Sequence, residues 1–273
     1  MEYLKELISS FSRLELIVLA CITLFLISII VFLALTIFSR RRKNRRERIA
    51  KMFIKHIEKT LFMVAFDGLT FNDLKQRPVF QKKWKKKLYR DQFLKELIKL
   101  RRVYDGEIGK KLQEFYRASG LLKLSYEKLR SSKWYMKCEG IQELSEMEIK
   151  KAAPIIQEQT KSSNDTLKMV ALIEVIHLKG IKGLNLLKDY DEPLNDWIQL
   201  NLLDSIKESE DQEEIPDFGY LLEANNDSLI VFGMRLITFF RQRQHLETIE
   251  NLMGSPSRKI RMQADISFEK LSI

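Results

Sequence analysis

The pattern of apolar positions separates a short N-terminal stretch from the rest of the chain. Leu16–Phe38 contains 23 consecutive positions without a charge, a glycine or a proline. As an α-helix this stretch would be about 34 Å long, enough for a hydrocarbon core of about 30 Å. The main alternative is a cleaved secretory signal, which has a shorter apolar run of about 7–15 residues and a small-residue cleavage site. Because this run is longer and ends in arginines, we expect a transmembrane helix over 16–38.

The charges on either side of this run predict its orientation. The preceding segment, residues 1–15, has two basic residues and three acids, whereas 40–51 has eight basic residues and one acid. Basic flanks stay in the cytoplasm. We therefore expect a single-pass membrane protein with a short extracytoplasmic N-terminus and a cytoplasmic C-terminal domain. The basic residues expected at the anionic lipid headgroups are Arg40, Arg41, Arg42, Lys43, Arg45, Arg46 and Arg48.

The juxtamembrane region, 39–90, contains a second basic cluster. Apolar residues between Met52 and Val64 predict that the helix continues with one apolar face. Gly68 and Pro78 then interrupt the periodicity and predict a loop.

The stretch 75–90 has eight basic residues and no acid, with Trp84 and Tyr89 among them. Aromatic rings in a basic patch suit the headgroup zone of an anionic leaflet. The alternatives are a solvated helix face or contact with an acidic protein or nucleic acid. The residues assigned to the membrane surface here are Lys82, Lys83, Trp84, Lys85, Lys86 and Lys87.

The rest of the chain has a repeating pattern with a period of 31 residues. Asn-Asp pairs begin at Asn164, Asn195 and Asn226. Asparagine can cap a helix, and Ser257 holds the equivalent place in the next repeat. Three further columns follow with the spacing of one helix face. The first column is Met136, Leu167, Ile198, Leu229 and Ile260; the second, mostly small, is Gly140, Ala171, Leu202, Gly233 and Ala264; the third is Leu144, Val175, Ile206, Ile237 and Phe268.

A second apolar helix is expected about 17 residues after each first one. Its columns are Ala153, Leu184, Ile215 and Leu246, then Ile156, Leu187, Phe218 and Ile249. Each unit is then a helical hairpin that must stack on its neighbours to bury its apolar face. The fold predicted is all-α, with one transmembrane helix followed by an α-solenoid.

Units of this length, with Asp near the first cap and a small residue in mid-helix, resemble HEAT repeats. The resemblance covers Ser132–Ile273. The family pattern also favours Arg or Lys after the first apolar column, and Gln199 and Ile230 depart from it. Tetratricopeptide repeats differ, since their 34-residue period and signature positions are absent. Residues 91–131 lie outside the register and are expected to form a helical cap or degenerate repeats. The helices expected in and around that region are Leu88–Val103, Glu107–Ser119 and Leu121–Leu129.

The candidate chemistry is sparse. The chain has three histidines and two cysteines, with no metal-ligand spacing and no phosphate-binding, hydrolase or kinase motif. We therefore expect a non-enzyme without cofactor or metal. An enzyme related to HEAT-like alkyl-base glycosylases or bilin lyases would need catalytic residues in a cleft, and none is found at matching spacing.

Charge is distributed unevenly. The whole chain has a net charge of +10, but 188–228 contains thirteen acids and two bases. This acidic region is either a solubilising surface or a binding face, since second helices line the inner surface of HEAT-like solenoids. The residues predicted to bind a protein partner on that face are Glu158, Asp189, Glu214, Asp217, Tyr220, His245 and Asn251.

These features predict a membrane-anchored cytoplasmic scaffold whose solenoid binds a protein partner, itself membrane-associated. Among small bacterial proteins with this organisation, the resemblance implies a place beside glycosyltransferases that make polysaccharide. The alternative is a membrane-tethered regulator that responds to nucleic acid or another signal through its basic clusters. Because topology already explains the first cluster, we do not expect nucleic-acid binding. The oligomeric state stays open.

Overall fold

The computed structural model describes residues 13–190, 192–208 and 215–272. The side chains of residues 13–16, 20, 46, 50, 189, 207 and 208 are outside what it describes. All regular structure in the described residues is helical, which confirms the predicted all-α class. The described residues form two units, one of residues 13–63 and 72–96 and the other of residues 64–71, 97–190, 192–208 and 215–272. The sequence predicts that the juxtamembrane region ends at residue 90, whereas unit 1 ends at residue 96.

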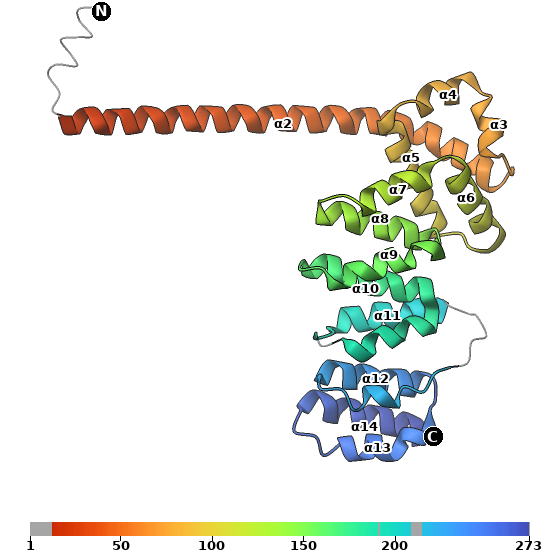
Figure 1. Cartoon of the computed structure of the whole chain (residues 1–273). Coiled ribbons are helices and arrows are strands. Elements are labelled where there is room, and N and C mark those ends of the chain that lie inside the picture. The colour runs from red at the N-terminus through yellow and green to blue at the C-terminus, as the bar shows by residue number, and fades with distance from the viewer. Residues whose placement is uncertain (1–12, 191, 209–214, 273) are drawn as a thin grey trace, which may run out of the picture. The chain divides into compact units, whose positions relative to one another are not determined.

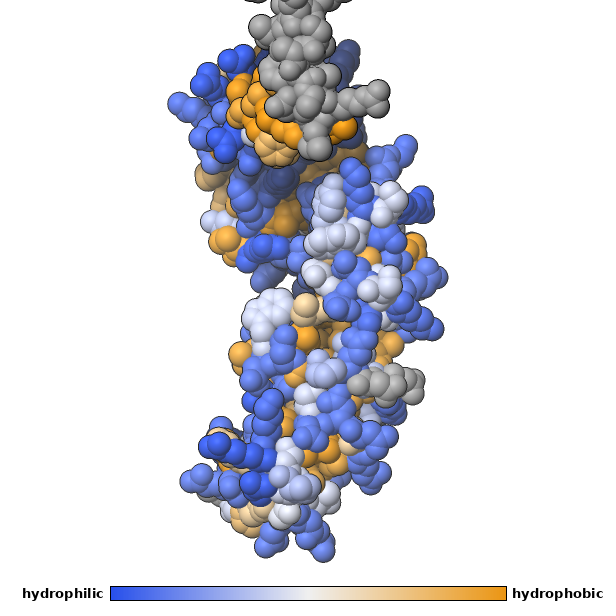
Figure 2. Space-filling model, turned by 90° about the vertical axis from the view of Figure 1, so that its left-hand side faces the viewer, coloured by the Kyte–Doolittle hydropathy of each residue, from blue (hydrophilic) through white to orange (hydrophobic). Residues whose placement is uncertain are grey.

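Unit 1 is built on one long helix. Helix α2, Arg13–Ala65, contains the apolar run and continues without a break through the basic segment (Figure 1). Near the N-terminus it is long and apolar enough to cross a membrane. The large apolar side chains of 17–38 are exposed, so no part of the described chain covers them. Figure 2 looks along this helix and shows its apolar side chains at the surface.

Three shorter helices complete this part of the chain: α3, Phe71–Lys75; α4, Pro78–Trp84; and α5, Lys87–Arg101. The prediction of a loop over 66–80 is therefore wrong at Phe71–Lys75 and from Pro78 onward, where the chain is helical. Pro78 occupies the first turn of α4, where its missing N–H removes no helix hydrogen bond, so a proline that suggested a loop instead begins a helix. The core of the unit is rich in aromatic rings, with Tyr89 and Phe93 fully buried.

Unit 2 contains the remaining helices. They are α6, Gly106–Ala118; α7, Leu121–Leu129; α8, Trp134–Glu146; α9, Ala153–Glu158; α10, Asp165–Lys179; α11, Asp196–Glu208; α12, Asp227–Phe239; α13, Leu246–Leu252; and α14, Arg258–Ser272. Within this unit α7, α8, α10 and α11 pack against one another in chain order, and α12 packs against α14 (Figure 1). The helices expected at Leu88–Val103, Glu107–Ser119 and Leu121–Leu129 are confirmed, each within a few residues, by α5, α6 and α7.

The predicted asparagine caps are confirmed. The side-chain oxygens of Asn164, Asn195 and Asn226 accept the backbone N–H groups of Leu167, Ile198 and Ser228 at 3.0, 2.9 and 2.9 Å. Each bond satisfies a donor that the first helical turn leaves free. At the next equivalent position, the backbone carbonyl of Ser257 accepts a hydrogen bond from the Arg261 N–H.

The predicted apolar columns are buried. Leu167, Ile198, Leu229 and Ile260 of the first column are all at most 5% exposed, as are Leu144, Val175, Ile206 and Ile237 of the last column. Met136 and Phe268, at the ends of the two columns, are half-buried. The first helices therefore bury the face that the 31-residue register assigns to the core.

The segments after the first helices are less regular than expected. The segment that follows α8 contains the short helix α9, whereas the segment that follows α10 is a 3-10 helix, Gly180–Asp189 (η3). After α11 the described residues 215–218 are not helical, and only Gly219–Leu221 forms a short 3-10 helix (η4). Ile215 is 48% exposed, so its assignment to a buried helix face is wrong. Phe218, by contrast, is fully buried.

Polar contacts link α11 to α12. The buried Gln199 amide donates to the carbonyls of Leu194 and Ser228 at 3.0 and 3.2 Å and accepts from Arg235. Arg235 also contacts Asp196 at 3.0 Å. A cation from the following helix is thereby held against the buried Gln199 amide.

Gly140 shows why the mid-helix column is small. A Cβ at this position would lie 2.6 Å from the Leu129 nitrogen and 2.7 Å from the Ser125 carbonyl oxygen, both backbone atoms of α7. We predict that Gly140→Ala lowers the free energy of unfolding by about 1–3 kcal/mol, because two backbones would have to separate. Thermal unfolding of the full chain measures this. The control is Gly254→Ala, whose Cβ would meet no atom closer than 3.5 Å. Equal stability of the two variants would contradict this explanation.

Candidate interaction surfaces and buried polar clusters

The residues predicted to bind a protein partner occupy different environments. Glu158 ends α9 and Asn251 lies in α13, and both side chains are exposed. Asp217 is also exposed, but Tyr220 is half-buried rather than fully exposed. Glu214 and the side chain of Asp189 lie outside the described residues. The structure therefore describes five of the seven side chains, of which three are exposed.

Asp217 and His245 are brought together. The Asp217 carboxylate lies 2.5 Å from His245 Nε2 and accepts the Gly219 backbone N–H at 2.7 Å. The Gly219 N–H, and after it His245, lower the pKa of the Asp217 carboxyl. A Cβ at Gly219 would lie 2.4 Å from the His245 ring, so glycine is required for the ring to approach. The pair fixes the turn before η4 against the segment before α13.

Tyr220 links η4 to η3. Its hydroxyl donates to the Leu184 carbonyl at 3.3 Å, and the Lys188 ammonium lies 4.9 Å from the ring centroid. Burial raises the pKa of the Tyr220 hydroxyl to about 12. A ring held in this way contributes to packing between neighbouring segments, and only part of it remains available to a partner.

The first basic cluster lies on α2 directly after the apolar run. The side chains of Arg40, Arg41, Arg42, Lys43, Arg45 and Arg48 are all exposed, while the side chain of Arg46 is outside the described residues. Lys43 and Glu47 approach within 3.9 Å, a contact between exposed groups that contributes little stability. These cations are free to interact with an anionic surface.

The second basic cluster sits on an aromatic core. Lys82, Lys85, Lys86 and Lys87 are exposed and Lys83 is half-buried. Trp84 stacks on Phe80 with ring centroids 5.0 Å apart and meets Phe93 edge-on at 5.2 Å. Tyr89, expected among the headgroups, is fully buried, so its ring cannot contact lipid. The aromatic residues thus hold the lysine-bearing segment in place rather than all facing outward.

His56 lies beside this cluster in unit 1. Its Nδ1 is 2.8 Å from the Tyr89 hydroxyl. Burial, and then the charges of Lys83 and Lys59, lower the pKa of the imidazole below 6.5. Burial and Lys86 likewise lower the pKa of the Lys83 ammonium. The cations here repel one another.

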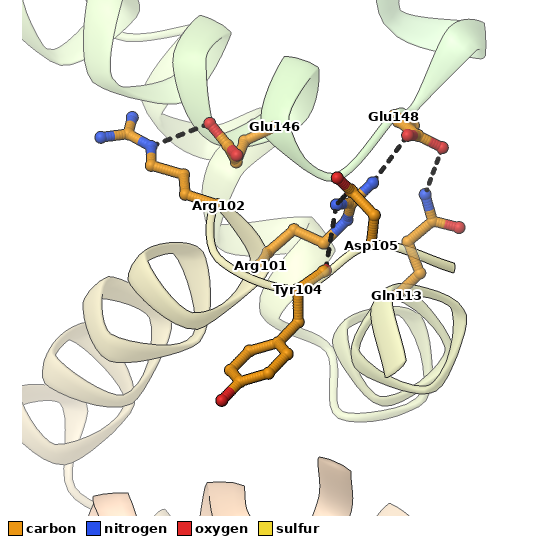
Figure 3. Close-up of polar contacts among 7 residues, drawn as sticks. All are labelled: Arg101, Arg102, Tyr104, Asp105, Gln113, Glu146 and Glu148. Carbon is orange, nitrogen blue, oxygen red and sulfur yellow. Dashed lines mark hydrogen bonds and ion pairs between the residues drawn. The ribbon is translucent and has the colours of Figure 1, made fainter. Parts of the chain in front are cut away.

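Unit 2 contains a buried cation that the sequence did not single out. Arg101, whose side chain is 8% exposed, joins the end of α5 to the start of α6 and to the turn after α8 (Figure 3). Its guanidinium contacts the Asp105 carboxylate and, at 2.6 Å, that of Glu148. Glu148, at positive φ, also accepts from Gln113, and Arg102 pairs with Glu146 at 2.8 Å. The sequence around Arg101 does not distinguish it from its exposed neighbour Arg102.

A second buried ion pair joins α7 and α8. The Lys128 ammonium contacts the carboxylates of Glu139 and Glu143, and Ser125 donates to Glu143 at 2.7 Å. Burial alone lowers the pKa of Lys128, but the two carboxylates outweigh it and raise that pKa. Burial raises the pKa of Glu143 against the opposing effect of Lys128. Because one ammonium touches two carboxylates, we take the pair as ionised at neutral pH.

In the described residues no group of three or more His, Cys, Asp or Glu side chains could hold a metal ion. The sequence matches no protein-family model, no curated protein and no solved structure. The functional assignment therefore rests on the residues of this chain.

We predict that loss of the partners of Arg101 destabilises the protein more than loss of Arg101 itself. Asp105→Ala with Glu148→Ala leaves a buried cation without a carboxylate and should cost about 3 kcal/mol. Arg101→Met leaves two carboxylates that reach water and should cost about 1–2 kcal/mol. Urea unfolding of the full chain gives both values. Arg102→Met, at a more exposed pair, is the matched control and should cost less than about 1 kcal/mol. The reverse order would show that Arg101 acts mainly by packing.

We also predict that unit 1 becomes less stable as the pH falls below 6.5. The unfolded chain then binds a proton at His56, whereas the folded chain, with its lowered pKa, does not. Stability is therefore fully present above pH 6.5 and decreases on acidification. Thermal unfolding between pH 7 and 5 should show this decrease, and His56→Gln should reduce it. Lys83→Gln, which removes one of the repelling charges, should reduce it partly. An unchanged pH profile in both variants would rule out His56 as the source.

Proposed function

We propose that this protein is a membrane-anchored scaffold that binds a protein partner through a helical solenoid. The anchor is residues 16–38 of α2, which have the length and composition to cross a membrane. The orientation proposed, with the N-terminus outside and the C-terminal domain in the cytoplasm, follows from the excess of basic residues after Phe38.

The spacing of helix starts is the observation that carries the scaffold proposal. Helices α8, α10, α11, α12 and α14 begin at residues 134, 165, 196, 227 and 258, each 31 residues after the last. Equal spacing, with asparagine caps and buried columns in register, supports a solenoid of HEAT-like units. The irregular second segments are compatible with it, since the first helices retain the register while the connections vary.

The proposed role is binding rather than catalysis. Stacked repeats present a large continuous surface, which suits a protein partner. Glu158 and Asn251 are exposed on the second helices α9 and α13, and the exposed Asp217 carboxylate contacts His245 just before α13. We propose that these residues belong to the partner-binding face. The partner would itself be membrane-associated, because the anchor confines the scaffold to the membrane. A role beside a polysaccharide-synthesising glycosyltransferase rests on the HEAT-like resemblance alone.

The first basic cluster is proposed to contact anionic lipid. Arg40–Arg48 follows the apolar run by two to ten residues, or about 3–15 Å along a helix axis. This range covers the headgroup layer and the first Debye length beyond it. Each of these cations would add about 1 kcal/mol of attraction to an anionic leaflet.

We predict that added positive charge on the second helices weakens partner binding. The test is crosslinking in intact membranes followed by purification of tagged full chain, comparing wild type with Glu158→Lys/Asn251→Lys. A partner bound at this face should be recovered at least about tenfold less by the variant. The control, Glu114→Lys/Glu127→Lys, changes exposed residues of α6 and α7 and should leave recovery unchanged. Equal recovery by all three proteins would exclude the proposed face.

A further inference from the structure

The second basic cluster is a set of cations without acidic partners. Lys82, Lys83, Lys85, Lys86 and Lys87, here called the lysine surface, form no ion pair within the described part of the chain. Their segment is fixed by the stacking of Trp84 on Phe80. A positioned group of like charges is unfavourable by itself and favours an anionic partner.

Its place along α2 separates this surface from lipid. The Lys86 ammonium lies 5.9 Å from the centroid of the Phe53 ring, so the lysine surface is level with that part of α2. Phe53 is 15 residues beyond Phe38, or about 22 Å along a continuous helix. The headgroup layer extends only about 5–8 Å beyond the hydrocarbon core, and charges are screened over about 8 Å. On an upright α2 the lysine surface is therefore beyond the reach of headgroups, unlike Arg40–Arg48.

The chain itself carries the complementary charge. The region 188–228 has an excess of eleven acids over bases, thirteen against two. Several of its described carboxylates are already paired, as in Asp196 with Arg235 and Asp217 with His245. Asp204, Glu223 and Asp227 are exposed and form no ion pair among the described residues. They are available to cations of another molecule.

We propose that the lysine surface of one copy binds the acidic residues Asp204, Glu223 and Asp227 of a second copy in the same membrane. The inference rests on the membrane anchoring proposed above, because the anchor sets the distance from lipid and confines the copies to two dimensions. Confinement raises the effective concentration, so individually weak surface pairs suffice for association. Each copy carries both sets of residues, so a copy bound through one set keeps the other set for a further copy.

The experiment measures energy transfer between differently labelled full-length copies in phosphatidylcholine vesicles, which carry no net charge. Wild type should associate and lose the association as salt is raised. Lys82→Glu/Lys85→Glu/Lys87→Glu should weaken it at least about tenfold, as should Asp204→Lys/Glu223→Lys/Asp227→Lys. Mixing the two variants should restore association, because each then supplies the surface that the other needs.

The matched control is Lys123→Glu/Lys150→Glu/Lys151→Glu, which makes the same change in net charge at exposed lysines of unit 2 and should associate like wild type. Failure of the mixed variants to associate would overturn the proposal. So would association that appears only with added phosphatidylglycerol, which would assign the lysine surface to lipid. Flotation of every variant with the vesicles reports the anchor separately, so a failed anchor and a failed contact between copies are distinguishable.

Discussion

The folded part of this protein depends on the burial of apolar helix faces against neighbouring helices. Most helices of unit 2 have 15 residues or fewer, and isolated helices of that length are marginal in water. The side chains of Leu144, Val175 and Ile237 stabilise the fold because neighbouring helices exclude water from them. Gly140 permits that contact at backbone distance, and the asparagine caps fix where each first helix begins. Caps, small residues and apolar columns therefore all serve the burial of one helix face against its neighbour.

That constraint explains which features could be predicted from the sequence. The caps at Asn164, Asn195 and Asn226 and the buried columns depend on local chemistry repeated at a fixed interval, so they are readable without coordinates. The second segments depend instead on what space remains after the first helices have packed. Ile215 looked like a member of an apolar column, but the segment around it is not helical and its side chain is exposed. Pro78 misled in the opposite sense, because a residue that usually ends helices also begins them.

The buried charges could not be predicted for a different reason. Arg101 and Arg102 are neighbours of the same type, yet only Arg101 is buried, and its acidic partners lie 4 and 47 positions away. Lys128 and Glu143 are likewise ordinary residues of amphipathic helices until α7 and α8 meet. For the candidate surfaces, the sequence assigned Asp217 and His245 to one face but did not predict that their side chains contact each other. The sequence predicted that the rings of Tyr220 and Tyr89 are exposed. In the structure Tyr220 is half-buried and Tyr89 is fully buried.

The continuity of α2 has a mechanical consequence. The helix passes from the apolar run to the core of unit 1 without a break. The buried residues Ile57 and Leu61 therefore belong to the same helix whose other end would lie in lipid. About 38 Å of helix separates Phe38 from Met63. If α2 spans a bilayer, a change of about 10° in its tilt displaces the far end of this rigid segment by about 7 Å. Tilting is one way in which a spanning helix adapts to bilayer thickness, so a change in thickness would then move the folded unit laterally.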